Sequence, residues 1–265
     1  MMDIGDGQGI CVRPITQQDV QACGVLLGLC FEEEGFSQAL TAVLDEPASR
    51  RRFLRDGSIS NVGSFATRQC ALVADAAPTA ASTAAPATPA APTPPATPAA
   101  PAASPAPTAA PTAASTAAPA FDGLPAGIAL FDAAGVFSSS DYDAMGKQAL
   151  DCGCETLNAT EAQLVRERAR LLDSIDNGSW CARAYPNGYA YIAALCVNPR
   201  HRGSGVLSAL LDTVIARAQK AKLPLCLDAF SERPRDIYAH KGFELIETVI
   251  TKELSLTQYR MTRLP

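Results

Sequence analysis

The distribution of apolar residues divides most of the chain into alternating strands and helices. A solid apolar run, YAYIAALCV at residues 189–197, predicts a strand buried on both faces, and Pro199 ends it. Val206 then opens a stretch with apolar residues at helical spacing. The run Leu223–Phe230 predicts the next, parallel strand. The order strand, helix, strand favours an α/β fold.

The N-terminal part continues this pattern. Val12–Ile15 predicts a first strand, and Val20–Phe31 predicts a helix with an apolar stripe. A second helix is expected over Ser37–Leu54, and its three arginines at 50–52 are interpreted as a solvated face. Gln69–Asp75, with the sequence QCALVAD, predicts a short apolar strand.

Residues 76–120 contain only Ala, Pro, Thr and Ser. Such a segment has no large side chain to bury, and its prolines oppose helix and sheet, so we expect a disordered or polyproline-like excursion. Gly127–Phe131 has the pattern of a hairpin partner for the strand at 69–75. The prediction is therefore one domain over residues 1–265, interrupted by an enlarged loop at 76–120, which costs little because loop closure depends only weakly on length.

The remaining segments are less regular. Leu157–Ile175 predicts an amphipathic helix with Thr160 as a possible N-cap. Trp180–Pro186 is interpreted as the opening of the strand at 189–197. Glu244–Val249 and Thr251–Leu256 are rich in strand-forming residues and would complete a mixed sheet.

The turn between the strand at 189–197 and the following helix has the composition of an anion site. Gly203 and Gly205 precede the helix, and Arg202 adds a fixed positive charge. Unpartnered N–H groups and the positive end of the helix dipole favour a phosphate there, and glycines let the backbone approach it. The alternative is a plain tight turn between a core strand and a core helix.

Two other phosphate-binding patterns fit poorly. A Walker loop needs a lysine just before its helix, and no lysine lies between Lys147 and Lys220. A dinucleotide fingerprint would use the two glycines, with Asp228 as the ribose-binding acid. However, five residues separate the strand from Gly203, and the third small position is Ser208.

The turn resembles the acetyl-CoA pyrophosphate loop of the GNAT family of N-acetyltransferases. That family has a strand ending in Val-x-Pro, then Arg or Gln-x-x-Gly-x-Gly/Ala, then a helix; residues 197–199 and 202–207 fill these places. Leu207 departs, because Gly or Ala is usual there. A second match follows in SERPRDIYAHKGF, where Ser231, Tyr238 and the pair Gly242-Phe243 occupy a family signature.

The resemblance implies a central mixed, mostly antiparallel sheet whose parallel fourth and fifth strands splay apart, flanked by helices. It implies acetyl-CoA as cosubstrate and no metal, with Tyr238 as the acid that protonates the departing thiolate. The implied cofactor-binding residues are Leu195, Cys196, Val197, Arg202, Gly203, Ser204, Gly205, Val206, Leu207, Ser231 and Tyr238.

The activity expected from the resemblance is transfer of an acetyl group to a primary amine of a small molecule or a protein. The alternative is a degenerate module that binds CoA without turnover. The general base stays open among Glu32, Glu33, Asp228 and a water chain ending at Tyr191. The acidic trio that contains Glu32 and Glu33 is either an attractor for the amine or a solvated helix end.

Composition limits the partners. A net charge of −5 and a pI near 5.1 give no footprint for nucleic acid or an anionic membrane. The start of the chain lacks the pattern of a signal peptide, so we expect a cytoplasmic or nuclear protein, either a monomer or a homodimer. The nine cysteines are expected to be reduced thiols, and Cys152-Gly153-Cys154 is too tightly spaced for a typical zinc site.

Overall fold

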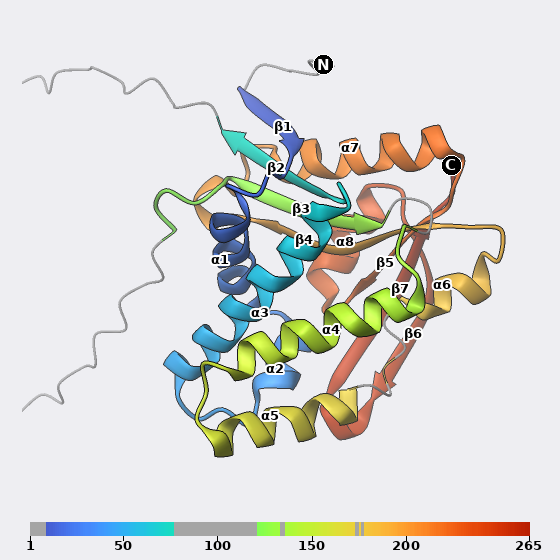
Figure 1. Cartoon of the computed structure of the whole chain (residues 1–265). Coiled ribbons are helices and arrows are strands. Elements are labelled where there is room, and N and C mark those ends of the chain that lie inside the picture. Colours follow the sequence, from blue (N-terminus) through green and yellow to red (C-terminus); the bar gives the residue numbers. More distant parts are fainter. Residues whose placement is uncertain (1–8, 77–120, 133–135, 173–174, 176–177) are drawn as a thin grey trace, which may run out of the picture. The chain divides into compact units, whose positions relative to one another are not determined.

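The computed structural model describes residues 9–76, 121–132, 136–172, 175 and 178–265. In these residues, seven strands form one sheet in the order β1-β2-β3-β4-β5-β7-β6 (Figure 1). The pair β4–β5 is parallel and all other neighbours are antiparallel. The strands are β1 (Ile10–Pro14), β2 (Ala71–Ala76), β3 (Gly127–Asp132), β4 (Ala190–Val197), β5 (Leu225–Ala229), β6 (Glu244–Thr251) and β7 (Leu256–Arg263). The expected mixed α/β sheet is confirmed.

Helices cover both faces of this sheet. They are α1 (Val20–Phe31), α2 (Gly35–Thr41), α3 (Pro47–Thr67), α4 (Ser139–Cys154), α5 (Ala159–Leu172), α6 (Ser179–Ala184), α7 (Val206–Ala221) and α8 (Glu232–His240), with short 3-10 turns η1 (Pro199–His201) and η2 (Lys252–Leu254). Figure 1 shows α7 on one side of the strands and α1, α3 and α4 on the other.

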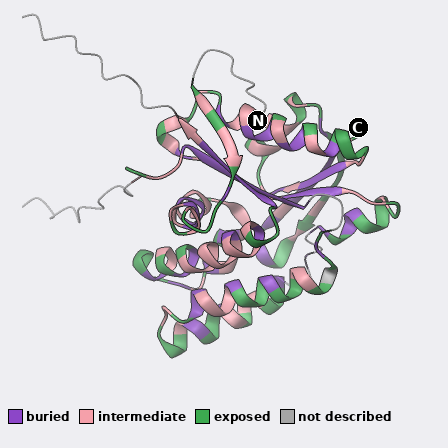
Figure 2. Cartoon of the chain, turned by 45° about the horizontal axis from the view of Figure 1, so that its top comes forward, coloured by how far each residue is buried: buried purple, intermediate pink, exposed green. Residues whose placement is uncertain are grey.

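The core therefore has two main layers, one on each face of the sheet. Leu210 and Leu211 of α7 pack with Ile192 and Leu227 of the sheet. On the other face, side chains of α1 and α3 pack against β2 and β3; they include Leu26, Phe65, Val73, Ile128 and Leu130. Burying each such side chain contributes about 1.5–3 kcal/mol. In Figure 2 the central strands are buried, whereas the edge strands β1 and β6 and the outer helix surfaces are largely exposed or half-buried.

Two glycines let α1 lie directly on α3. A Cβ atom added at Gly24 would lie 2.5 Å from Cα of Ile59, and one added at Gly28 would lie 2.7 Å from Cα of Arg55. Any side chain at these positions would push the helices apart. The close contact fixes the position of α1, whose last turn lies near the C-terminal end of β4.

The expected helix Ser37–Leu54 is wrong, because this region forms two helices. The Glu34 carboxylate caps α2 by accepting hydrogen bonds from the backbone N–H groups of Phe36 (3.0 Å) and Ser37 (2.9 Å). Pro47 starts α3 within its first turn, where a proline is tolerated. The helix continues past Gly57 to Thr67, and that glycine brings α3 close to α4.

Several other boundaries also need correction. Trp180–Pro186 does not open a strand, because α6 lies there and buries Trp180. Helix α5 is capped by Asn158 rather than Thr160, since the Asn158 side chain accepts from the N–H of Glu161 at 2.9 Å. The last strand, β7, lies later than the expected Thr251–Leu256. Ala76 still belongs to β2, and residues 77–120 of the expected loop lie outside the described residues.

The parallel pair β4–β5 separates after three residue pairs, the last being Ile192 with Leu227. In the described chain, β4 continues to Val197 with β3 as its only partner, and β5 continues to Ala229 beside β7. The β3–β4 register also shifts by one residue, which leaves Ala193 without a partner in β3. The expected splay between the fourth and fifth strands is present.

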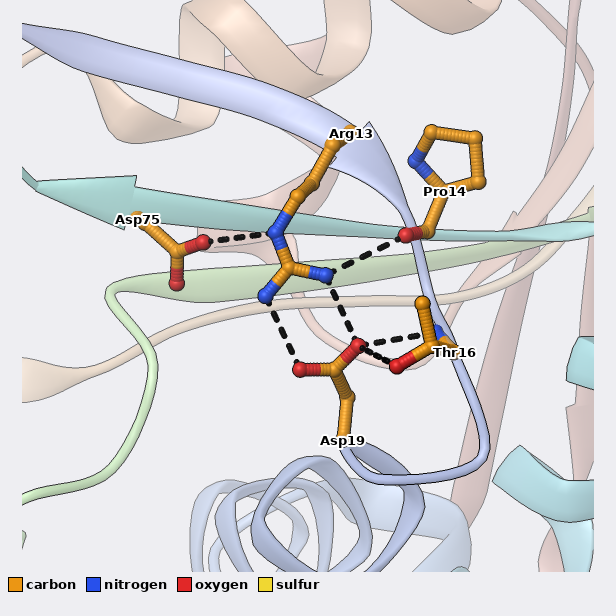
Figure 3. Close-up of polar contacts among 5 residues, drawn as sticks. All are labelled: Arg13, Pro14, Thr16, Asp19 and Asp75. Carbon is orange, nitrogen blue, oxygen red and sulfur yellow. Dashed lines mark hydrogen bonds and ion pairs between the residues drawn. The ribbon is translucent and has the colours of Figure 1, made fainter.

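A cluster of charged groups fixes the entry from β1 into α1 (Figure 3). The Arg13 guanidinium donates to both oxygens of Asp19, at 2.7 and 2.9 Å, and its Nε donates to Asp75 of β2 at 3.0 Å. The Asp19 carboxylate also accepts from the N–H and hydroxyl groups of Thr16. The hydrogen bonds from Arg13 hold the pKa of Asp19 well below its ordinary range.

We predict that Asp19→Asn lowers the free energy of unfolding by about 1–2 kcal/mol at pH 7, a value reduced by partial solvent exposure. The ionised form is the one stabilised, so the contribution is present above the ordinary carboxyl pKa of about 4 and is lost as pH falls through the lower folded-state value. Urea unfolding at pH 7 and pH 3 should show the difference from wild type narrowing at the lower pH. Asp212→Asn, at an exposed ion pair with Lys241, is the control and should change stability by less than about 0.5 kcal/mol. An unchanged difference at pH 3 would show that the charge of Asp19 is not responsible.

Candidate active site

The turn after β4 is held in place by a buried asparagine. Asn198 is 1% exposed, and its side-chain oxygen accepts from the N–H of Arg200 at 3.1 Å. Its amide nitrogen donates to the carbonyl oxygens of Phe121 and Pro125, at 3.3 and 3.2 Å. The turn is thus attached to the segment that leads into β3, which fixes it relative to the sheet.

The two glycines of the turn are required by backbone conformation. Gly203 and Gly205 have φ angles of 80° and 88°, in the left-handed region that favours glycine. The space beside them is open: a Cβ at Gly203 would meet nothing within 4 Å, and one at Gly205 would meet only Ile10, at 3.7 Å. Their absent side chains therefore leave backbone amides accessible from outside.

These amides form a row of hydrogen-bond donors at the start of α7. Ser204 N–H bonds to the carbonyl of His201, and Ala209 N–H bonds to that of Gly205. Among the described residues, no acceptor is found for the N–H groups of Gly203, Gly205, Val206, Leu207 and Ser208. Exposed Arg202 precedes them. Unpaired amides, a helix N-terminus and a cation together fit an anion such as a pyrophosphate. Leu207 still offers its main-chain N–H, so its unusual side chain removes no donor.

The predicted cofactor strand lies at the open end of β4. Leu195, Cys196 and Val197 all follow the last β4–β5 pair, so in the described chain they have no strand partner on that side. Leu195 and Val197 pack toward α7, whereas Cys196 packs with the α1 layer. The Cys30 thiol of α1 donates to the Val197 carbonyl at 3.7 Å.

Tyr238 lies on α8, half-buried against the α7 layer. Its ring meets Phe243 edge-on at a centroid distance of 5.7 Å. Burial raises the pKa of Tyr238, and the nearby Cys196 sulfur raises it further, which relates this hydroxyl to the open end of β4. No hydrogen-bond partner of the hydroxyl is found among the described residues. Ser231 is exposed just before α8 and makes no side-chain cap.

A partly buried carboxylate joins four parts of the structure next to the splay. Asp228 of β5 accepts from the N–H of Gly178 (3.1 Å), from Nε1 of Trp180 (2.9 Å) and from the hydroxyl of Tyr191 (2.8 Å). Gln258 of β7 also donates to it. Burial raises the pKa of Asp228 and, still more, that of Tyr191. Because its oxygens are engaged, Asp228 does not resemble the free acid of a dinucleotide site.

The three acidic residues after α1 have different surroundings. Glu32 pairs with Arg51 of α3 at 3.0 Å, so the arginines at 50–52 are not simply a solvated face. Glu34 caps α2, and burial raises its pKa. Glu33 is exposed, and no hydrogen bond or ion pair to its carboxylate is found within the described residues.

The part of the chain that carries both motifs matches a known family. Residues 174–243 match the acetyltransferase (GNAT) family. This segment is the part of the chain that is similar to the GNAT acetyltransferases. It begins before α6 and ends at Phe243, so it contains the amide row, the open end of β4 and Tyr238. No curated protein matches the whole sequence at a significant level.

Solved structures give the same fold. A protein described as histone acetyltransferase HPA2 and related acetyltransferase, from Corynebacterium glutamicum, is 17% identical with a TM-score of 0.51, covering 97% of each chain. A mosquito arylalkylamine N-acetyltransferase-like protein is 14% identical with a TM-score of 0.51, covering 97% of this chain and 100% of its own. At these identities the likeness shows the fold. The GNAT family and fold support acyl transfer as the general chemistry.

The described residues were also compared with the requirements of a metal site and of a membrane-spanning helix. They contain no group of three or more His, Cys, Asp or Glu side chains that could hold a metal ion. None of their helices is long and apolar enough to cross a membrane. Cys152 and Cys154 lie in the last turn of α4, where Cys154 is buried.

The sequence analysis did not predict that Asn198 would anchor the turn or that Cys30 would contact β4. The Asn-Pro pair at 198–199 is a turn signal, so the structural role of Asn198 had a visible sign. The contact of Cys30 with β4 had none, because a thiol on an apolar helix fits the core equally well.

We predict that Asp228→Asn lowers the free energy of unfolding by about 2–3 kcal/mol. An asparagine keeps one acceptor oxygen. Its NH₂ group would replace the second carboxylate oxygen and would face the groups that now donate hydrogen bonds to that oxygen. Urea unfolding at pH 7 measures the change. The control, Asp236→Asn on the exposed side of α8, should stay within about 0.5 kcal/mol of wild type. A variant as stable as wild type would mean that the network does not hold these elements together.

Proposed function

We propose that this protein transfers an acetyl group from acetyl-CoA to a primary amine of a small molecule or a protein. The observation that carries the proposal is the continuity between the open end of β4 and the row of unpaired amides that starts α7. A cosubstrate with an extended amide-containing arm and a pyrophosphate needs both features side by side. We also propose that the protein acts in the cytoplasm or nucleus, as a monomer or homodimer.

The residues present fit such a cosubstrate. The main-chain N–H groups of Gly203, Gly205 and the first turn of α7, together with Arg202, would hold the pyrophosphate. Main-chain groups from Leu195 through Val197 would pair with the pantetheine arm, and Ser231 would bond to another part of CoA. When bound, acetyl-CoA supplies an activated thioester.

Tyr238 is the proposed general acid. The phenol is protonated at neutral pH, the state that an acid needs, because the ordinary tyrosine pKa of about 10 already lies above neutrality and burial raises it. The phenol would give its proton to the departing thiolate sulfur. The hydroxyl is available for this role because no partner among the described residues engages it.

The acceptor amine must lose a proton. Of the four candidates for a general base, Glu32 is paired with Arg51, while Asp228 and Tyr191 are bonded to each other. Glu33 is therefore the carboxylate that we propose for attracting the amine or receiving its proton, directly or through water.

Release of free CoA thiol from acetyl-CoA, measured over a panel of amines, tests the function. The panel contains agmatine, arylalkylamines and a lysine-rich histone peptide, which follow the names of the structural neighbours. The neighbour named for agmatine has a TM-score of 0.50 and 12% identity. An enzyme gives amine-dependent thiol release. Binding of CoA by calorimetry without release would instead favour the degenerate binding module. Tighter binding of a nicotinamide dinucleotide than of CoA would overturn the site assignment.

We predict that Gly203→Asp binds CoA at least about tenfold more weakly than Gly203→Asn, because the new carboxylate would oppose the pyrophosphate. The two variants have equal size, and both residue types tolerate positive φ, so they differ mainly in charge. Calorimetric titration with CoA compares them, and circular dichroism checks that both are folded. Equal affinities would show that no anion binds at this turn.

We predict that Tyr238→Phe lowers kcat by roughly 10²–10⁴-fold, since only the proton donor is lost. The dissociation constant for acetyl-CoA should change by less than about fivefold, because the proposed pyrophosphate and pantetheine contacts lie elsewhere. If Tyr238 is the acid, the wild-type rate should decline at a pH above the ordinary tyrosine pKa of about 10, as the phenol loses its proton. The Tyr238→Phe variant should not show this decline. Tyr259→Phe, in the same buried layer, is the control and should leave kcat unchanged. A Tyr238→Phe variant as fast as wild type would assign this tyrosine to packing.

A further inference from the structure

Two cysteine thiols lie together beside the open end of β4. Cys30, on the last turn of α1, donates to the carbonyl of Val197 at 3.7 Å. Cys196 precedes that residue and packs in the same buried layer as Cys30. The two thiols are close enough for each to shift the pKa of the other. The fold thus brings together two cysteines that are 166 positions apart in the sequence.

The two thiols have unequal surroundings. Cys30 is half-buried, and the neighbouring Cys196 thiol lowers its pKa; burial and Glu33 oppose this effect, and the Arg202 charge supports it. Cys196 is 7% exposed, and the neighbouring Cys30 thiol together with burial raises its pKa. A reachable thiol of low pKa beside a buried thiol has the arrangement of an attacking and a resolving cysteine.

The molecule contains its own comparison pair. Cys181 and Cys226 also pack in one buried cluster, but both are 0% exposed. Burial raises the pKa of Cys181 strongly, and Asp228 raises it further. An oxidant in solution reaches neither sulfur, because both are fully buried. This pair should be inert under conditions in which Cys30 reacts.

We propose that Cys30 and Cys196 form a peroxide-sensitive dithiol, and that their disulfide and bound CoA oppose each other. The Cys30 thiolate attacks hydrogen peroxide, giving a sulfenic acid and hydroxide as the O–O bond breaks. The Cys196 thiol then attacks that sulfur, forming the S–S bond and releasing water. Two thiols are oxidised, and one peroxide is reduced to two waters.

The opposition to CoA rests on the proposed function. A pyrophosphate at the turn would neutralise Arg202, which favours the Cys30 thiolate, and the pantetheine arm would cover the Val197 carbonyl that Cys30 contacts. Both changes make Cys30 less reactive. By linkage, if CoA favours the dithiol form, the disulfide lowers CoA affinity by the same factor.

The test treats the full chain with hydrogen peroxide, with and without desulfo-CoA, a probe that has no thiol of its own to oxidise. Peptide mass spectrometry should find a Cys30–Cys196 link that is two hydrogens lighter and reversible by dithiothreitol. Saturating desulfo-CoA should slow its formation by about tenfold, corresponding to about one unit of thiol pKa. Calorimetry of reduced protein with desulfo-CoA, run separately, tests the proposed function alone.

Variants assign the roles of the two sulfur atoms. Cys196→Ser should leave a sulfenic acid on Cys30 that dimedone labels, whereas Cys30→Ser should abolish the link. Cys181→Ser is the matched control and should leave both the link and its rate unchanged. Oxidation confined to other cysteines, such as exposed Cys11 and half-buried Cys152, would overturn the dithiol. A link that forms equally fast with desulfo-CoA shown to be bound would overturn its opposition to CoA.

Discussion

The Asp228 carboxylate is the constraint on which the opening of the sheet depends. Its hydrogen bonds join the segment before α6, Trp180 in α6, and Tyr191 in β4. Partial burial gives this carboxylate a desolvation cost, which this many donors can offset. Because Tyr191 lies within the three paired positions of β4 and β5, the network closes the sheet immediately before the point where the two strands part.

The opening itself costs few hydrogen bonds, because each strand keeps a partner on its other side. Beyond Ile192, β4 stays beside β3, and beyond Leu227, β5 stays beside β7. Only the groups that face the opening lack strand partners. Asn198 fixes the far end of β4 to the segment before β3, so the open edge is held at both ends without a bound molecule.

The sequence predicted the elements whose determinants are local. Val20–Phe31 has the observed helix bounds, and the strand, turn and helix around Gly203 follow from apolar runs and glycines. The Asp228 network could not be predicted, because its donors Gly178, Trp180 and Tyr191 lie 37 to 50 residues away. The same network explains the error at Trp180, whose apolar character fits a strand, while its N–H finds an acceptor only in the folded chain. The start of α2 depends on Glu34, which the sequence presents only as a solvated acid or an amine attractor, and the separate start of α3 lies at Pro47.

Ala193, the unpaired residue in β4, shifts by one position the pattern in which side chains alternate between the two faces of the sheet. Before it, Ala190 and Ile192 face the α7 layer; after it, Leu195 and Val197 do, so the alternation passes from even to odd positions. Cys196 consequently meets α1 instead of α7. If Ala193 were paired with β3 in a regular register, the alternation would continue unbroken, so Cys196 would face α7 and Leu195 and Val197 would face α1. In this short stretch, the irregular register therefore specifies the site as strictly as residue identity does.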